Sequence, residues 1–208
     1  LREAVRPFTG VLRRQYRMHP SLSGVPRELF YFGEALQDGR AGQPPGDFVK
    51  LVQVDHPGTR AEDNPAEADE IRGWLERIAA LRAAGSTDVA AALVITPYRA
   101  QERLLRRTLG EAQRAGTVAD ITVEICTLDR CQGREADLVF LSLVRNRATP
   151  FLDQPKRWNV ALTRARDGLF IVGDVDAFHR EARRARREAG PHDPPRMSLL
   201  ARILESYA

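Results

Sequence analysis

The sequence predicts a doubly wound α/β fold, in which a mainly parallel β-sheet is flanked by helices on both faces. Short apolar runs alternate along the chain with segments in which apolar residues recur every three or four positions. One of these runs, LVFLSLV at residues 138–144, is almost continuously apolar, which is typical of a strand buried on both faces of a parallel sheet.

The first half of the chain contains two strand–helix units. Residues 48–54 predict a strand, and the helix after it begins at Asn64 and Pro65, since asparagine caps a helix and proline suits its first position. This helix carries an apolar face and is expected to end near Gly85. The second unit follows as a strand over residues 89–96 and a helix over residues 99–115.

The second half continues the alternation. Apolar runs predict three more strands, over residues 121–127, 137–144 and 169–172, and a helix is expected over residues 156–164. Two further helices end the chain. The first, over residues 175–189, is rich in arginine, and its charges either form a solvated surface or contact nucleic acid. The last, over residues 199–207, is amphipathic.

The composition is that of one globular domain of ordinary size, or of slightly more than one. The chain has 208 residues, 43% of them hydrophobic, and a net charge of +4, which weakly favours a polyanionic partner such as nucleic acid. No run of 18 apolar residues is present, so no membrane partner is expected. Cys126 and Cys131 form neither a disulfide framework nor a zinc ligand set. We therefore expect both to be packing residues, with no metal site and a reducing, cytoplasmic location.

Polar residues follow the predicted strands at two places. The stretch TPYRAQ leaves one strand at Thr96, and TLDRCQGREAD leaves another at Thr127, with Gly133 and Glu135 in the loop that follows. In open α/β sheets, ligands bind at the carboxyl ends of the strands, so we expect these residues at the functional edge. The alternative is that both are ordinary polar loops. Tyr98 of the first stretch either stacks on a base or is a core aromatic residue.

The stretch RWNVALTRARDGLFIVGD, residues 157–174, places Arg164 and Arg166 between a predicted helix and a strand. Because arginine is costly to bury unpaired, an anion is expected beside them. The alternative is an internal ion pair with one of three aspartates, Asp137, Asp167 or Asp174. The chain contains no GxxxxGK[ST] sequence, whose amides and lysine would cradle the phosphates of a nucleoside triphosphate. It therefore has suitable arginines but no phosphate cradle of its own.

Four stretches together carry a family resemblance. QYRMHP (15–20), TPYRAQ (96–101), TLDRCQGREAD (127–137) and RWNVALTRAR (157–166) occur in this order and at a familiar spacing. They resemble the second RecA-like domain of superfamily 1 helicases, in the branch that contains the nonsense-mediated decay helicase and senataxin. The resemblance covers most of the chain. It implies a RecA-like fold, ATP and Mg²⁺ as cofactors, and single-stranded DNA or RNA as a partner.

The resemblance also implies roles for individual residues. Tyr16 would stack on the adenine of ATP, and Arg17 and Arg164 would be catalytic residues that reach the γ-phosphate. Apart from the resemblance, we expect Arg166 to brace the fold. Gln15, Gly133 and Glu135 would complete the ATP-binding residues. Five residues at the ends of strands would contact nucleic acid: Thr96, Pro97, Tyr98, Thr127 and Asp129.

We expect three parts in the chain: an entry segment (residues 1–20), a RecA-like domain (21–175) and a C-terminal helical extension (176–208). Because the phosphate cradle is missing, the resemblance implies a partner, an N-terminal RecA-like domain of the same protein that holds Mg²⁺ and most of the ATP. The intact enzyme would hydrolyse ATP and move 5′ to 3′ along a single strand. The alternative is a non-catalytic module with the same fold that binds nucleic acid or senses a nucleotide.

Overall fold

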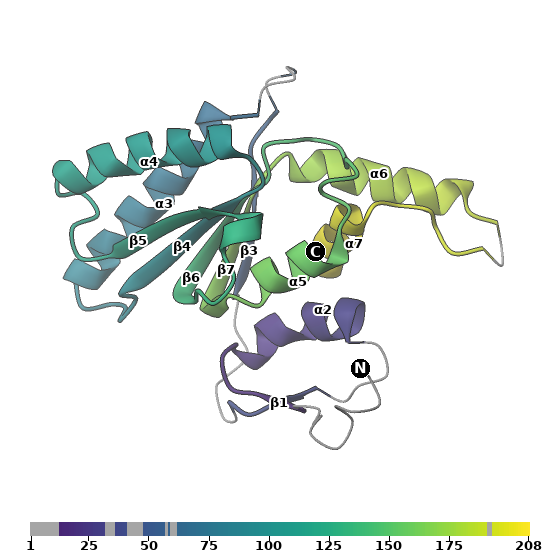
Figure 1. Ribbon diagram of the computed structural model, residues 1–208, viewed down its shortest axis with the longest axis horizontal. Helices are drawn as coiled ribbons and strands as arrows, with labels where there is room; N and C mark the ends of the chain where they lie inside the picture. Colours follow the sequence, from purple (N-terminus) through teal and green to yellow (C-terminus); the bar gives the residue numbers. More distant parts are fainter. Residues whose placement is uncertain (1–12, 32–35, 41–47, 57, 59–61, 191–192) are drawn as a thin grey trace, which may run out of the picture.

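The computed structural model describes residues 13–31, 36–40, 48–56, 58, 62–190 and 193–208, and its centre is a five-stranded sheet (Figure 1). The strands lie in the order β3–β7–β6–β4–β5, and every pairing is parallel. Their bounds are β3 (Val49–Gln53), β4 (Ala91–Thr96), β5 (Thr122–Thr127), β6 (Ala136–Ser142) and β7 (Ala165–Gly173). This arrangement confirms the predicted doubly wound α/β fold.

Helices cover both faces of the sheet, α3 and α4 on one face and α2, α5, α6 and α7 on the other (Figure 1). Their bounds are α2 (Pro20–Phe30), α3 (Pro65–Ala83), α4 (Arg99–Arg114), α5 (Pro155–Leu162), α6 (Val175–Glu188) and α7 (Leu199–Ser206). A single 3₁₀ turn, η2 (Leu128–Arg130), follows β5, and a two-stranded parallel sheet pairs β1 (Arg14–Gln15) with β2 (Gln37–Asp38). Among the described residues, no helix combines the length and the apolarity needed to cross a bilayer.

Among the features that the sequence did not predict are the two-stranded sheet, the early start of β7 and helix α2. Strand β7 begins at Ala165, earlier than predicted, because Ala165 pairs with Ala136 of β6 before an irregularity in register, where the polar residues Arg166 and Asp167 hide the strand from an apolar pattern. Helix α2 was not predicted, since Pro26 lies inside it and removes one backbone donor. Three buried side chains on one face of α2 hold it against the sheet: Leu22, Val25 and Leu29.

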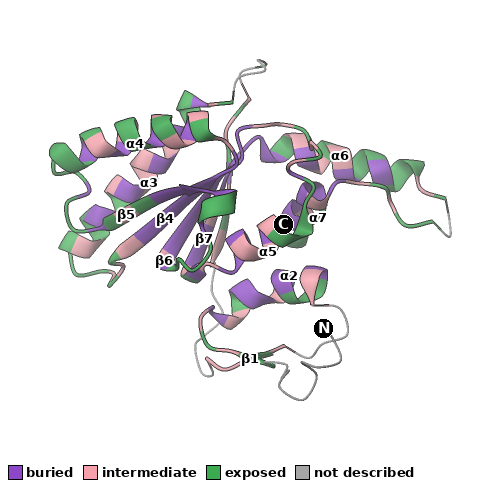
Figure 2. Cartoon of the chain, viewed as in Figure 1, coloured by how far each residue is buried: buried purple, intermediate pink, exposed green. Residues whose placement is uncertain are grey.

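The core lies in two layers because successive residues of a strand point to opposite faces of the sheet. In β6, for example, Val139 and Leu141 pack under α2 and α5, whereas Phe140 packs under α3 and α4. All three side chains are buried, and the central strands β4, β6 and β7 lie as a mostly buried band between the helices in Figure 2. Trp158 of α5 is also fully buried, and its Nε1 donates a hydrogen bond of 2.5 Å to the carbonyl oxygen of Leu152.

A buried polar network joins the first turns of α3 and α4 to the carboxyl end of β6. Ser142 donates a hydrogen bond of 2.6 Å to the Glu67 carboxylate, and the backbone N–H of Val144 donates one of 3.0 Å. Asn64 caps α3, and the amide of Gln101 reaches both the Asn64 carbonyl oxygen and the Ser142 hydroxyl. Val144 adopts a φ of 66°, which is strained for a β-branched residue. The bonds to Glu67 thus hold a bend that begins the loop after β6.

Glu67 should make the stability of the protein fall as pH rises. Burial raises the pKa of its carboxyl group from about 4.5 to about 7. Between these two values the unfolded chain releases the proton while the folded chain retains it, so the folded state loses on the order of 3 kcal/mol relative to the unfolded state. Glu67→Gln has no such proton. Its free energy of unfolding, measured in urea between pH 4.5 and pH 8, should therefore rise relative to that of the parent by about this amount.

Comparing Glu67→Gln with the parent separates the pH-dependent contribution of Glu67 to stability from the contributions of the histidines. Burial lowers the pKa of both His19 and His56, so these residues contribute stability that increases with pH, but they do so equally in the parent and in the variant. A difference between parent and variant that stays constant from pH 4.5 to pH 8 would contradict the prediction.

Candidate functional site

Three arginines gather at the amino ends of β6 and β7, which we call the amino edge of the sheet. Arg164 immediately precedes β7, and Arg166 is the second residue of that strand. Arg17 comes from the segment between β1 and α2, and its Nε lies 2.5 Å from Oε2 of Glu135, the residue before β6. Arg166 approaches the other oxygen of the same carboxylate at 3.9 Å. We call these four residues, Arg17, Glu135, Arg164 and Arg166, the arginine cluster.

Arg164 is held by neutral oxygen atoms. Its Nε donates a hydrogen bond of 2.8 Å to the carbonyl oxygen of Val160, and Nη1 donates one of 3.1 Å to that of Arg134. Burial and the nearby charge of Arg17 lower the pKa of Arg164 from its usual value. Within the described part of the chain, Arg164 forms no ion pair with a carboxylate. Its guanidinium group is therefore oriented by the backbone while its charge remains unneutralised.

Arg17 and Glu135 form the close ion pair of the cluster. The hydrogen bond from Arg17 lowers the pKa of Glu135, and the charges of Arg166 and Arg164 act in the same direction. Arg17 also donates a hydrogen bond of 3.2 Å from Nη1 to the carbonyl oxygen of Thr163, the residue before Arg164. Both side chains of the pair are more than one-third exposed, so the pair is open to an incoming ligand.

Of the three aspartates considered as partners for Arg164 and Arg166, one lies near Arg166 and the other two lie beside other arginines. Arg166 lies 4.0 Å from Asp137, which agrees with the structural alternative for this residue. Asp167 instead pairs with Arg40 at 2.9 Å, and Asp174 lies 3.7 Å from Arg180.

The QYR segment, residues 15–17, presents Tyr16 to solvent. Tyr16 is 64% exposed, which is unusual for an aromatic residue. The side chain of Gln15 is engaged internally, since its oxygen accepts hydrogen bonds from the N–H groups of Arg17 and Met18 at 3.0 and 2.8 Å. Gln15 thus braces the turn that presents Tyr16 and Arg17.

The expectation that the TLDRCQGREAD loop lies entirely at the carboxyl ends of the strands is wrong. Strands β5 and β6 are parallel, so the connection from Thr127 to Ala136 must run from one edge of the sheet to the other. Glu135 consequently lies at the amino edge, whereas η2 lies at the carboxyl edge. Gly133, in the second half of the connection, adopts a φ of 79° that favours glycine and turns the chain toward β6.

The carboxyl edge holds the residues expected to contact nucleic acid, but several are buried. Thr96 is fully buried, and its hydroxyl group has no hydrogen-bond partner among the described residues. Pro97 is buried as well, and Thr127 is only 6% exposed. Tyr98 is half-buried, and Asp129 is exposed.

Sequence reasoning missed a stack of four side chains at this edge, which we call the aromatic ladder. Arg145 lies over the ring of Tyr98 at 5.4 Å, Tyr98 stacks on Phe151 at 6.0 Å, and Arg157 lies over Phe151 at 4.1 Å. Arg157 also forms an ion pair of 2.7 Å with Asp129. Arg145 and Phe151 lie in the loop after β6, so their position after a predicted strand was the available signal.

The two cysteines belong to the core, and Tyr31, a further tyrosine that could have stacked on a base, is half-buried. Cys126 and Cys131 are buried with free thiols, and both belong to the apolar cluster under α2 and α5. Tyr31, at the end of α2, accepts a hydrogen bond of 3.3 Å from Asn159. Among the described residues, no group of three or more metal-ligating side chains is present.

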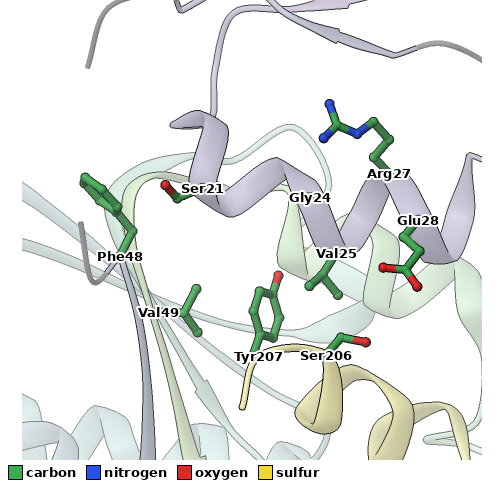
Figure 3. Close-up of a pocket in the computed structure, with 9 residues that line it drawn as sticks. All are labelled: Ser21, Gly24, Val25, Arg27, Glu28, Phe48, Val49, Ser206 and Tyr207. Atoms are coloured by element: carbon green, nitrogen blue, oxygen red, sulfur yellow. The ribbon is translucent and has the colours of Figure 1, made fainter. Parts of the chain in front are cut away.

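A cavity of about 560 Å³ lies between α2, the end of α7 and the start of β3 (Figure 3). The hydroxyl group of Tyr207 points toward α2 in this view, and it has no hydrogen-bond partner among the described residues. Neither the arginine cluster nor the aromatic ladder contributes to its lining, so the cavity is separate from both sites.

Comparison with known proteins shows the family to which the chain belongs. The family model described as "AAA domain" matches residues 3–176. Two proteins named regulator of nonsense transcripts 1 homolog are similar to this chain, with 35% identity in Neurospora crassa and 33% in Drosophila melanogaster, over 80% and 82% of this chain. A protein of Mus musculus named 5'-3' DNA helicase ZGRF1 is 31% identical over 82% of this chain.

The chain spans only 17%, 15% and 9% of the lengths of these three relatives. The similarity therefore concerns one domain of much longer proteins. Since the family model covers most of the chain, the chain belongs to the AAA domain family, as a C-terminal RecA-like domain of the superfamily 1 helicase branch that includes the regulators of nonsense transcripts.

Proposed function

We propose that this chain is the second motor domain of an ATP-dependent helicase that acts on single-stranded DNA or RNA. In this proposal the arginine cluster faces the phosphates of an ATP molecule held mainly, with Mg²⁺, by an N-terminal RecA-like domain of the same protein. The observation that carries the proposal is the position of Arg164 beside the ion pair of Arg17 with Glu135, next to the exposed ring of Tyr16. The relatives named helicases support the same function.

The chemistry of the cluster suits phosphoryl transfer. Negative charge develops on the phosphoryl oxygens during transfer, and a preorganised arginine that stabilises this charge contributes about 10³- to 10⁵-fold to the rate. Arg164 is preorganised by backbone oxygens, and its charge is not neutralised by an ion pair in the described part of the chain. Arg17 is oriented by Glu135 and by the carbonyl oxygen of Thr163. Tyr16 would provide a ring face for the adenine.

The arginine cluster and the aromatic ladder lie at opposite edges of the sheet, and this arrangement supports coupling between ATP hydrolysis and nucleic-acid binding. Helix α5 begins beside the aromatic ladder at Arg157 and ends just before Arg164 at the arginine cluster. A shift of this helix would therefore change both sites together. Closure of the two motor domains around ATP would then change how tightly the ladder binds single-stranded nucleic acid. Movement in the 5′ to 3′ direction is part of this proposal.

The aromatic ladder is the part of the carboxyl edge best suited to a single strand. Bases of any sequence stack on aromatic rings and on arginine planes, whereas arginine charges attract the phosphates. Tyr98, Phe151 and Arg145 are half-buried, so each retains surface for a ligand. Because Thr96 and Thr127 are both buried, we assign the binding of bases to the ladder, and contacts with the backbone of the nucleic acid to Asp129 and neighbouring amides.

Replacing Arg164 should abolish most of the ATP hydrolysis. In the full-length protein, Arg164→Ala should lower turnover on the order of 10³-fold, while the affinity for ATP falls less, because the arginine acts on charge that develops during transfer. Arg164→Lys should restore little, since a lysine lacks the planar fork of the guanidinium group. The measurements are steady-state ATPase activity with single strand present, and nucleotide binding by each variant.

Arg72→Ala is the matched control, because Arg72 forms a surface ion pair of 3.2 Å with Asp69 on α3, outside both sites. It should retain the parental turnover. The 208-residue chain alone should hydrolyse no ATP. If Arg164→Ala kept the parental rate, Arg164 would only brace the backbone, and the non-catalytic alternative would be favoured.

Single strands should bind this chain weakly, with little sequence preference and with strong dependence on salt. Tyr98→Ala should weaken binding by about tenfold, because a stacked base contributes roughly 1–3 kcal/mol. Tyr16→Ala, which removes an exposed aromatic ring from the amino edge, is the control and should leave binding unchanged. Fluorescence titration of labelled oligonucleotides at two salt concentrations measures both. An equal loss of affinity in the two variants, or tight binding that does not depend on salt concentration, would contradict the proposal that bases bind on the aromatic ladder.

A further inference from the structure

The segment Asp38–Gly39–Arg40 lies against the QYR segment along its whole length. Strand β2 pairs in parallel with β1, with Gln15 opposite Asp38. The N–H of Gly39 then donates a hydrogen bond of 2.6 Å to the carbonyl oxygen of Gln15. The two segments are far apart in the sequence, so this contact depends on the fold and not on local sequence.

Each residue of the Asp38–Gly39–Arg40 segment contacts a different residue of the QYR segment. Asp38 accepts a hydrogen bond of 2.6 Å from the amide of Gln15. Gly39 leaves room for Tyr16, because a Cβ atom at this position would overlap the tyrosine ring. Arg40 donates a hydrogen bond of 2.9 Å from Nη1 to the carbonyl oxygen of Arg17.

Arg40 also ties the QYR segment to the start of β7. The same Nη1 donates a second hydrogen bond, of 2.9 Å, to the carbonyl oxygen of Arg166, and Nη2 lies 2.9 Å from the carboxylate of Asp167. The N–H of His19 bonds to the Arg166 carbonyl oxygen as well, at 2.8 Å. One guanidinium group therefore fixes the backbone of Arg17 relative to the strand that begins directly after Arg164.

We propose that the Asp38–Gly39–Arg40 segment is a platform that sets the positions of the nucleotide-facing residues. Arg40 is a positioning residue that holds Arg17 in register with Arg164, and Gly39 is the position that allows the Tyr16 ring to lie at the site. The platform rests on the proposed function, since it matters for catalysis only if Arg17 and Arg164 face ATP. Arg40 itself does not face the phosphates, because its side chain is bonded to two backbone carbonyls and a carboxylate.

Arg40→Ala in the full-length enzyme tests the first part of the proposal. Misplacing a catalytic group by about 1 Å can cost on the order of 100-fold in rate, so kcat should fall roughly 10- to 100-fold, with a smaller change in KM for ATP. In an Arg17→Ala background, Arg40→Ala should lower kcat by no more than about twofold, because the group that it positions is already absent. An equal loss with and without Arg17 would overturn the positioning role.

Arg40→Lys separates positioning from direct contact with phosphate. A lysine ammonium can replace Nη1 between the two carbonyl oxygens, so this variant should recover most of the parental kcat. An arginine that met the phosphate through its planar fork would be rescued poorly by lysine, as expected at Arg164. Poor rescue at Arg40 in a protein with the parental melting temperature would therefore overturn the proposal, and the lysine variant remains informative if Arg40→Ala does not fold.

Gly39→Ala tests the second part. The added methyl group should displace the Tyr16 ring and raise KM for ATP by roughly three- to tenfold, the size of an aromatic stacking contribution, with little change in kcat. In a Tyr16→Ala background the same substitution should have no further effect on KM. A rise in KM that persists without Tyr16 would contradict the role of Gly39.

Arg27→Ala is the matched control for the platform, since Arg27 lies 3.4 Å from Asp38 but forms no hydrogen bond or ion pair with the QYR segment among the described residues. Its exposed ion pair contributes little, so kcat should stay within about twofold of the parent. If Arg40→Ala has the parental kcat while Arg164→Ala is inactive, the platform proposal fails and the proposed function stands. If Arg164→Ala also has the parental rate, the proposed function itself fails.

Discussion

The parallel pairing of β6 with β7 is the constraint on which the arrangement of the site depends. Ala136 lies opposite Ala165, so the residues just before these two, Glu135 and Arg164, are brought to the same edge of the sheet. A slip of one residue in this register would turn every side chain of a strand to the opposite face, and both faces here are packed. The apolar core therefore fixes the positions of charged residues that contribute little to it.

The order of strands and helices could be predicted because apolar periodicity and helix caps are local signals. Asn64, for instance, caps α3 as its sequence context indicates. The meeting of Glu135 with Arg17 could not be predicted from residue spacing, because it depends on the strand order and on the path of the connection after β5. The same holds for Arg40, whose partners are two backbone carbonyls that no side-chain pattern reveals. The resemblance named Arg164 and Arg17 but gave no account of what holds them.

Helix α5 links the two edges of the sheet through its packing. Trp158, near its start, is buried and bonded to the loop after β6 through Leu152. At its end, the carbonyl oxygen of Val160 holds Arg164, and that of Thr163 holds Arg17. Since a close-packed helix moves as a unit, the proposed coupling would carry a displacement at the aromatic ladder to the arginine cluster without a series of flexible side chains. At the carboxyl edge, the polar network around Glu67 fixes the loop that carries Arg145 of the aromatic ladder.

The charge balance of the arginine cluster gives a physical reason for it to bind an anion. Arg17 and Arg166 share the carboxylate of Glu135. Burial and the like charge of Arg17 lower the pKa of Arg164. Backbone bonds hold Arg164 in place, so the chain cannot relieve this repulsion by moving the side chain into solvent. In the proposed function, a polyphosphate would relieve it by adding negative charge beside Glu135, and most strongly when further charge develops during transfer. The fold thus retains an electrostatic cost in the free domain that a bound anion offsets.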